Sequence, residues 1–310
     1  MAYFRITITP TGPVSTEWVS GTVWGHMAWA VRYVEGESAL EQWITEQEES
    51  PWLFSSGMPE KMVPRPLLRP SRADKTIPSL TDYGRSKKAR KAPHIPESVF
   101  LALRNGLNEQ ALMDAIKQMP QPGSDGTKEH PVFHNQISRL SGRTLESDGL
   151  FVETTVWPAA DHHFQIFAAA DQFCKKRLAD LLTYIGDAGF GANASTGRGS
   201  FKFRIEEETK LFEESGNRAM SLSHGVITPE MKNPRYKLHT HYGKLGGHFA
   251  AGGHSPFKYP VLMARPGATF DPTGPPPFGK LLGNVHHDES LGFIRHHALH
   301  LPIHFTEVTP

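Results

Sequence analysis

Cysteine is nearly absent from this chain of 310 residues, which contains Cys174 alone. A single cysteine excludes an intramolecular disulfide and is typical of proteins that work in a reducing cytoplasm. Long apolar runs are lacking as well, so no segment reaches the length of a transmembrane helix. The first ten residues, MAYFRITITP, have neither the basic start nor the apolar centre of a signal peptide. We therefore expect a cytoplasmic protein that makes no contact with a membrane.

An excess of charge of one sign is also lacking, since 33 Lys and Arg residues balance 32 Asp and Glu residues. No global field attracts a polyanion, so any nucleic-acid contact has to come from a local basic patch. The densest patch is GRSKKARK, residues 84–91, within the proline-rich stretch 51–96. We expect a long insertion here, with an extended basic arm that reaches a phosphate backbone or an acidic partner. A solvated loop without a function is the alternative.

Sequence signatures of catalysis and of metal binding are missing too. The chain contains no HExxH, CxxC or GxSxG motif. His300 and His304 are separated by Pro302, which argues against a helix that would bring the two imidazoles together. His26, in a helical pattern, is the one candidate general base, although a lone helical histidine is more often structural. We expect no metal, no cofactor and no enzymatic activity.

The order of the predicted elements indicates an α+β fold. Residues 2–9 alternate like a strand and precede a helical pattern, and residues 149–206 predict strand, strand, helix, glycine-rich loop and strand. Two such halves favour a pair of ferredoxin-like units, which share their topology with RNA-recognition modules. The expected units are residues 1–148, with the basic insertion at about 55–130, and residues 149–310, with the glycine-rich loop 189–199.

The glycine-rich loop has the sequence GFGANASTGRGSFKF, residues 189–203. It is not a Walker A loop, because it lacks the Gly-Lys-Ser/Thr ending, and it is not a dinucleotide fingerprint, because that motif connects a strand to a helix. We expect a nest of backbone N–H groups that faces an anion, with Ser195, Thr196 and Arg198 as further donors. A tight connection without a binding role is the alternative.

Four segments together resemble the RAMP superfamily of CRISPR proteins. They are SGTVWGHMAWAV, then MVPRPLLRP with GRSKKARKAPHIP, then HNQISRLSGRTLESDGLFVETTVWP, and last GDAGFGANASTGRGSFKF. Their order and spacing are most similar to the fourth Csm subunit of type III-A effector complexes, a protein of the Cas-five group that caps the crRNA 5′ end. The resemblance covers nearly the whole chain. The resemblance is specific because all four segments occur together. The glycine-rich loop by itself is found in many RAMP proteins.

The resemblance implies two ferredoxin-like folds, no nuclease activity, and a role in holding the repeat-derived 5′ handle of crRNA. It also implies docking to the large polymerase/nuclease subunit and to the first backbone RAMP subunit. An alternative from another class is a RAMP endoribonuclease that processes crRNA precursors with His26 as general base. Such enzymes place the glycine-rich loop near the C-terminus, whereas residues 200–310 follow it here. A related subunit of a type III-B or III-D complex is a third possibility.

The resemblance also implies RNA contacts at particular positions. Thr22 and His26 would line a groove beside the first sheet, and Lys87, Lys88, Arg90 and Lys91 would form a thumb-like arm against the RNA. Asn135, Arg139 and Arg143 belong to the matched NQISRLSGRT block. In the glycine-rich loop, the implied contacts are Gly189, Gly191, Asn193, Ser195, Thr196, Gly197, Arg198 and Gly199.

Overall fold

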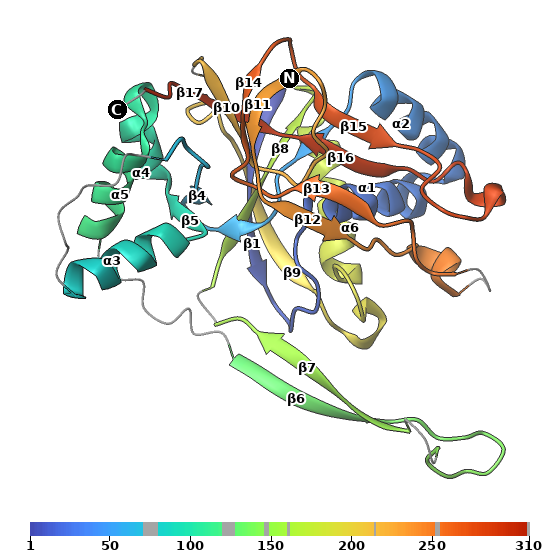
Figure 1. The fold of residues 1–310 in the computed structure, drawn as a ribbon. Coiled ribbons are helices and arrows are strands. Elements are labelled where there is room, and N and C mark those ends of the chain that lie inside the picture. The colour runs from blue at the N-terminus through green and yellow to red at the C-terminus, as the bar shows by residue number, and fades with distance from the viewer. Residues whose placement is uncertain are drawn as a thin grey trace.

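The computed structural model describes residues 1–70, 80–119, 128–145, 149–159, 162–213, 215–251 and 255–308 (Figure 1). Helices and strands are mixed along the chain, which confirms the expected α+β class. The α-helices are α1 (Ser20–Glu35), α2 (Glu37–Glu49), α3 (Leu80–Lys91), α4 (Glu97–Leu103), α5 (Glu109–Gln118) and α6 (Lys175–Ala188). Among the described helices, none combines the length and the apolar character needed to cross a membrane.

The first sheet has β1 at its centre, with β8 on one side and β9 on the other. Short strands β2 and β3 pair with the outer edge of β8, and every pair is antiparallel. The bounds are β1 (Ala2–Pro10), β2 (Leu53–Phe54), β3 (Met58–Pro59), β8 (Phe164–Ala170) and β9 (Phe201–Glu207). Along the chain, the elements of this sheet and of the helices that cover it come in the order β1, α1, β2, β8, α6, β9, with other elements between them.

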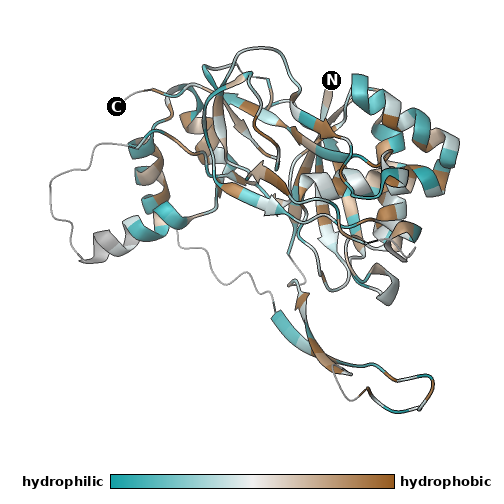
Figure 2. Cartoon of the chain, turned by 45° about the vertical axis from the view of Figure 1, so that its right-hand side comes forward, coloured by the Kyte–Doolittle hydropathy of each residue, from teal (hydrophilic) through white to brown (hydrophobic). Residues whose placement is uncertain are grey.

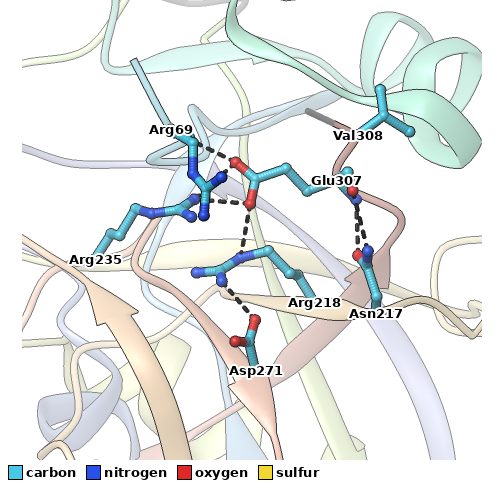
Figure 3. Close-up of a pocket in the computed structure, with 7 residues that line it drawn as sticks. All are labelled: Arg69, Asn217, Arg218, Arg235, Asp271, Glu307 and Val308. Carbon is cyan, nitrogen blue, oxygen red and sulfur yellow. Dashed lines mark hydrogen bonds and ion pairs between the residues drawn. The ribbon is translucent and has the colours of Figure 1, made fainter. Parts of the chain in front are cut away.

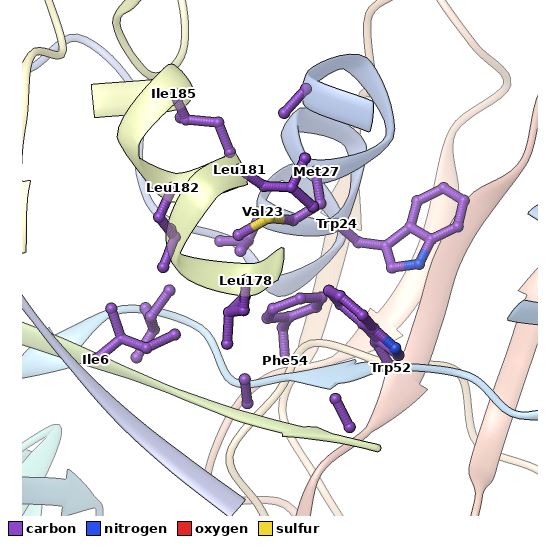
Figure 4. Packing of buried hydrophobic residues seen from close by; sticks show 14 of the residues in the cluster. Ile6, Val23, Trp24, Met27, Trp52, Phe54, Leu178, Leu181, Leu182 and Ile185 are labelled. Carbon is purple, nitrogen blue, oxygen red and sulfur yellow. The ribbon is translucent and has the colours of Figure 1, made fainter. Parts of the chain in front are cut away.

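One face of the first sheet is covered by helices. The alternation along β1 puts Phe4, Ile6 and Ile8 on this face, where they pack with apolar side chains of α1 and α6 (Figure 4). The buried helix residues include Val23 and Met27 from α1 and Leu178, Leu181 and Ile185 from α6. Burial of each large apolar side chain stabilises the fold by about 1.5–3 kcal/mol. The alternating apolar residues of β1 and the helically spaced apolar residues of α1 and α6 therefore hold this layer together.

The other face of the first sheet packs on a second sheet. Successive residues of β8 alternate between the two layers, since Ile166 and Ala168 face the helices whereas Phe167 and Ala169 face the second sheet. Leu301 and other apolar residues near the C-terminus complete this second cluster. β8 is therefore buried on both faces and joins the two halves of the core.

The second sheet repeats the strand order of the first. Its order is β11, β14, β10, β17, so that in both sheets the second, third, first and fourth strands follow one another. The bounds are β10 (Arg218–Ser221), β11 (Met231–Arg235), β14 (Thr269–Pro272) and β17 (Pro302–Phe305). No α-helix connects these strands in residues 215–251 and 255–308. In this part of the chain, the second sheet therefore repeats the strand order of the first sheet without its connecting α-helices.

The connections of the second sheet carry two small sheets and short 3₁₀ helices instead. The small sheets are β12 (Leu238–His241) with β13 (Val261–Ala264), and β15 (Phe278–Leu282) with β16 (His296–His300). The 3₁₀ helices along the whole described chain are η1 (Arg104–Gly106), η2 (Ala194–Thr196), η3 (Gly247–Ala251) and η4 (Glu289–Leu291).

The strand pairing differs from the expected division at residues 148 and 149. β1 pairs with β8 from Ala2↔Ala170 onward and with β9 from Phe4↔Glu207 onward, so strands assigned to different units share one sheet. The glycine-rich loop thus belongs to the first sheet and not to a C-terminal unit. Alternation identifies a strand but carries no information on its partner, and neighbours in sequence are the usual but not the necessary choice.

The expected extended basic arm is a helix. Residues 84–91 lie on α3, which packs against α5, while β4 (Met62–Pro64) pairs with β5 (His94–Pro96) on either side of the insertion. Lys, Arg and Ala are strong helix formers, and Pro93 stops the helix shortly after its last residue. Ala89 is buried, whereas Lys87, Lys88, Arg90 and Lys91 are exposed.

The element that projects from the molecule is a hairpin, residues 128–157. It is formed by β6 (Lys128–Asn135) and β7 (Leu150–Trp157), which pair along their whole length and extend away from the body (Figure 1). A bridge between Val14 and Val156 attaches its base to the loop after β1. We refer to β6, β7 and their connection as the projecting hairpin.

Candidate nucleic-acid interface

The conformation of the glycine-rich loop depends on glycine at three positions. The φ values are +93° at Gly189, the residue after α6, +90° at Gly191 and +75° at Gly199. Residues with a side chain rarely adopt such backbone angles. A Cβ at Gly199 would also overlap the backbone of Phe190, and one at Gly191 would overlap the side chain of Thr16. Gly197 has a φ of +82° but open space around it. Three of the glycines are thus required by close packing of the loop on itself and on residues 13–16.

Most of the loop N–H groups already have partners within the protein. The amide of Gly191 donates to Nε2 of His26 at 3.0 Å, and the amide of Ala192 donates to the Thr16 hydroxyl at 2.8 Å. The amide of Gly199 donates to the carbonyl of Pro13 at 2.8 Å. The N–H groups of the expected nest therefore donate to acceptors within the protein in this conformation. The solvent-exposed residues of the loop are Ala192, Asn193, Ser195, Thr196 and Gly197. The hydroxyl of Thr196 donates to the carbonyl of Asn193 at 2.8 Å.

His26 holds the loop rather than facing an open site. Its ring lies 4.4 Å from the ring of Phe190, which in turn stacks on Trp18 at 3.8 Å. Burial lowers the pKa of the His26 imidazole to about 4, so the ring is neutral near pH 7. Its Nε2 lone pair accepts the Gly191 amide and is not available to take a proton from a substrate. Thr22 lies one turn earlier on the same face of α1.

Arg198 joins the loop to the projecting hairpin. Its guanidinium is buried and lies 2.8 Å from the carboxylate of Glu153 on β7, and it also donates to the Ser15 hydroxyl at 3.1 Å. The side-chain amide of Asn193 donates to the same carboxylate at 2.6 Å. Arg198, expected as a donor to an anion, is therefore used in an internal ion pair. These contacts bring residues 13–18, the glycine-rich loop and the base of the hairpin to one place.

The distal part of the projecting hairpin is exposed and carries both cations and apolar side chains. Asn135, Arg139 and Arg143 are all exposed there. Apolar residues lie along the same hairpin (Figure 2), and Phe133 and Leu140 are 70% and 102% exposed. An exposed row of apolar residues next to cations is typical of a surface that contacts another molecule.

The predicted contact residues divide into two groups. The glycine-rich loop, Thr22, His26 and the projecting hairpin form one continuous region, whereas the cations of α3 lie beside α5 at the other side of the molecule (Figure 1). The cations of α3 therefore lie apart from the other expected contact residues. Within the described residues, no group of three or more His, Cys, Asp or Glu side chains is placed to hold a metal ion.

A cleft of about 310 Å³ on the second sheet is lined by residues that sequence reasoning missed (Figure 3). Glu307 accepts from the guanidinium of Arg235 at 2.7 Å and from the backbone amide of Arg69 at 2.8 Å. The buried guanidinium of Arg218 lies between Asp271 and Glu307. These ion pairs attach the C-terminal segment to β10, β11 and β14. No sequence signal could identify them, because the charged residues come from distant parts of the chain.

Comparison with known proteins shows which fold this is. No protein-family model matches the chain, and no curated protein matches it in sequence. In structure, the chain is similar to a protein of the Csm3–Csm4 subcomplex in the type III-A CRISPR-Cas interference complex, with a TM-score of 0.59 and 11% identity over 99% of this chain and 100% of that one. Its fold is thus that of a component of such complexes.

A second set of structures identifies that component. The chain is similar to a protein of the Csm1–Csm4 cassette in complex with pppApA, with a TM-score of 0.62 and 14% identity over 100% of both chains. The cassette in complex with AMPPNP gives a TM-score of 0.60 and 14% identity, again over both whole chains. Csm4 is the component that the cassette and the Csm3–Csm4 subcomplex have in common, so the chain has a Csm4-like fold. This confirms the resemblance at the level of the fold.

Proposed function

We propose that the chain is a non-catalytic RNA-binding subunit of a type III CRISPR interference complex. In this role it holds the 5′ handle of crRNA and docks the large polymerase/nuclease subunit and a backbone RAMP subunit. The observation that carries the proposal is the similarity in fold to Csm4 over the whole chain. Csm4 is found with Csm1 in one of these complexes and with Csm3 in the other, which supports two separate docking surfaces.

The proposal assigns RNA contact to the region around the glycine-rich loop. The Ser195 hydroxyl is presented to solvent there, whereas the Asn193 amide and the Thr196 hydroxyl already donate within the protein. Arg139 and Arg143 present cations on the projecting hairpin. Hydroxyls and guanidinium groups of this kind bind phosphates and fix the register of an RNA without reading its sequence. The repeated strand order supports the further proposal that the second sheet is a second ferredoxin-like unit, in which strands have replaced the helices.

Catalysis by His26 is disfavoured by its surroundings. A general base needs a free lone pair within reach of the proton that it abstracts. The Nε2 atom of His26 instead accepts a backbone amide, and burial lowers the pKa of the ring to about 4. We propose that His26 positions the glycine-rich loop and that the chain does not cleave RNA.

The test measures binding of repeat-derived single-stranded RNA by the full chain and its double variant Arg139→Ala/Arg143→Ala. The matched control is Lys175→Ala/Lys176→Ala, which removes two exposed cations from α6. If both hairpin arginines contact phosphates, the hairpin variant weakens binding at low salt and flattens the plot of log affinity against log salt by up to roughly 1.4, at about 0.7 per contact. The control keeps the wild-type slope.

Two results would contradict the proposal. One is that the folded chain has no affinity for the RNA and that no RNA with uniform 5′ ends co-purifies with it. The other is cleavage of the RNA that His26→Ala abolishes, which would establish the endoribonuclease alternative.

A further inference from the structure

One stretch of this nearly neutral chain has no negative charge. The 40 residues 231–270 contain no Asp or Glu, but they contain six Lys or Arg and six Phe or Tyr residues. Cations and aromatic rings are interleaved there, as in Arg235–Tyr236–Lys237 and in Phe257–Lys258–Tyr259. This local composition departs from that of the whole chain, in which the two signs of charge are equal within one residue. It is the composition of a surface that binds a polyanion with exposed bases.

The structure folds this stretch into a ladder of two strands. β12 and β13 pair from Leu238↔Ala264 to His241↔Val261, and an isolated bridge between Lys244 and Phe257 extends the ladder. Hydrogen bonds from Lys258 N to Gly243 O and from Leu245 N to Pro256 O support the extension. The ladder thus runs from residues 238–245 on one strand to residues 256–264 on the other.

Four aromatic side chains of this ladder are exposed. Tyr236, Tyr242, Phe257 and Tyr259 have 43%, 67%, 50% and 52% of their surface exposed, and we call them the aromatic platform. Two apolar residues beside them, Leu238 and Leu262, are 60% and 62% exposed. Rings held on paired strands lose little conformational freedom when a planar group stacks on them, so they provide a stacking surface at low entropic cost.

Three cations of the same stretch lack carboxylate partners. Lys237, Lys244 and Arg265 are exposed, and none of them forms an ion pair within the described part of the chain. The ammonium of Lys244 lies 5.2 Å from the centre of the Phe257 ring. Lys258 is different, because it is turned inward and donates to the carbonyl of Arg295 at 3.2 Å. The guanidinium of Arg265 donates to the carbonyl of Leu238 at 3.3 Å. Three cations without carboxylate partners, in one stretch with four exposed rings, match the alternation of phosphates and bases along a single strand.

The platform borders the helix that carries Thr22 and His26. The ring of Trp29 on α1 packs against Gly246 and Gly247, just after the first strand of the ladder. Arg32 of the same helix lies 2.8 Å from Nδ1 of His248. α1 also reaches the glycine-rich loop, because Nε2 of His26 accepts the amide of Gly191. The platform and the glycine-rich loop therefore lie on surfaces that α1 joins.

We propose that the aromatic platform is a second contact surface for single-stranded RNA, on which unpaired bases stack on Tyr242, Phe257 and Tyr259 while Lys237, Lys244 and Arg265 bind the phosphates. The inference rests on the proposed RNA-binding function and extends it to a region that the sequence resemblance left without a role. The surface binds RNA in any sequence, because stacking and phosphate contacts are insensitive to base identity.

The test compares the affinity of the full chain for a fluorescent oligouridine with that of Tyr242→Ala/Tyr259→Ala. Loss of stacked bases at two rings lowers the affinity by at least about tenfold, with an unchanged salt slope. Tyr242→Phe/Tyr259→Phe keeps the rings and retains the wild-type affinity. The matched control is Phe173→Ala, which removes an aromatic ring that is 84% exposed outside the platform and leaves the affinity unchanged. Lys237→Ala/Lys244→Ala instead reduces the salt slope, by up to roughly 1.4.

Each other outcome separates the two proposals. Wild-type binding that Tyr242→Ala/Tyr259→Ala leaves unchanged overturns the platform but keeps the proposed function. Normal RNA affinity with a lost pull-down of a partner subunit makes the platform a protein-docking surface and overturns the inference as well. A folded wild-type chain that binds no oligouridine and no repeat RNA overturns the proposed function and, with it, the platform.

Discussion

Gly197 and Gly199 lie two residues apart in one loop, but a side chain would meet different surroundings at each. Both have positive φ values, so any L-residue is strained at either position. At Gly199 a Cβ would in addition overlap backbone atoms of Phe190, which cannot move without opening the loop. At Gly197 nothing lies within 4 Å of the added atom. The same substitution therefore tests strain alone at one position and strain with overlap at the other.

We expect Gly199→Ala to lower the free energy of unfolding by about 3 kcal/mol or more, because overlap adds to backbone strain. Gly197→Ala should cost about 1–2 kcal/mol, the strain of a left-handed residue alone. Chemical denaturation of the two variants measures both values. Equal losses would mean that the loop does not pack on Phe190 as described.

At this scale the sequence predicted the residue types of the site but not their roles. The spacing of the glycines correctly marked a tight loop after a helix. It could not reveal that Arg198 pairs with Glu153 or that His26 accepts the amide of Gly191, because these partners lie far away in the chain and meet only in the folded sheet. Ionisable side chains near a glycine-rich loop look alike in sequence whether they face a ligand or the protein.

Among the elements, α3 carries the exposed cations of the segment that was expected to be an extended basic arm. Replacing Lys87, Lys88, Arg90 and Lys91 by Ala preserves the helix, since Ala has the highest helix propensity and none of these side chains is buried. If α3 lies along RNA, the quadruple variant weakens binding at low salt and reduces the salt slope by up to roughly 2.8, at about 0.7 per phosphate. Filter binding at several salt concentrations measures the slope.

The control for α3 removes Lys175, Lys176, Lys202 and Lys210, four exposed lysines on other elements, and so changes the net charge equally. An α3 variant that binds RNA normally but fails to recruit a partner subunit would assign α3 to an acidic protein face. A variant that is normal in both assays would leave α3 as a solvated helix.

Elements were more predictable than their arrangement. Local patterns predict the strand at residues 2–9 and the helix before the glycine-rich loop, and the structure confirms both. The projecting element was misassigned, because lysine density indicated an exposed segment without indicating its shape. The hairpin of β6 and β7 carries few charges on its strands, and its pairing depends on residues 128–157 meeting in register.

In the whole molecule, several histidines are buried where the layers meet. His297 and His300 on β16 have no exposed surface, and they contact the carbonyls of Trp52 and Val226 at 3.1 and 3.0 Å. Burial lowers the pKa of each ring to about 4. Both rings are therefore neutral in the folded protein near pH 7, and protonation requires the core to open.

We expect the protein to lose stability as the pH falls from about 6.5 toward 4. Because the folded pKa values lie below the unfolded value near 6.5, the unfolded chain binds more protons in this window, and the stability that is complete above it is lost. Each ring contributes roughly 2 kcal/mol of this loss at pH 5. Thermal unfolding between pH 5 and 7.5 measures it. A variant with His297→Gln and His300→Gln should show a shallower dependence, and an identical profile would exclude these two rings as its source.

The central position of β1 has a consequence for the ribosome-bound chain. β1 is made before both of its partners, which begin at Phe164 and Phe201, so both of its hydrogen-bonding edges lack their native partners until those strands have been synthesised. At about 5–20 residues per second this interval lasts on the order of 10 s or longer. An apolar strand with two open edges is a template for aggregation during that time. The nascent protein is thus a natural client of chaperones that cover emerging strands, and slower translation of the region before Phe164 would lower its soluble yield.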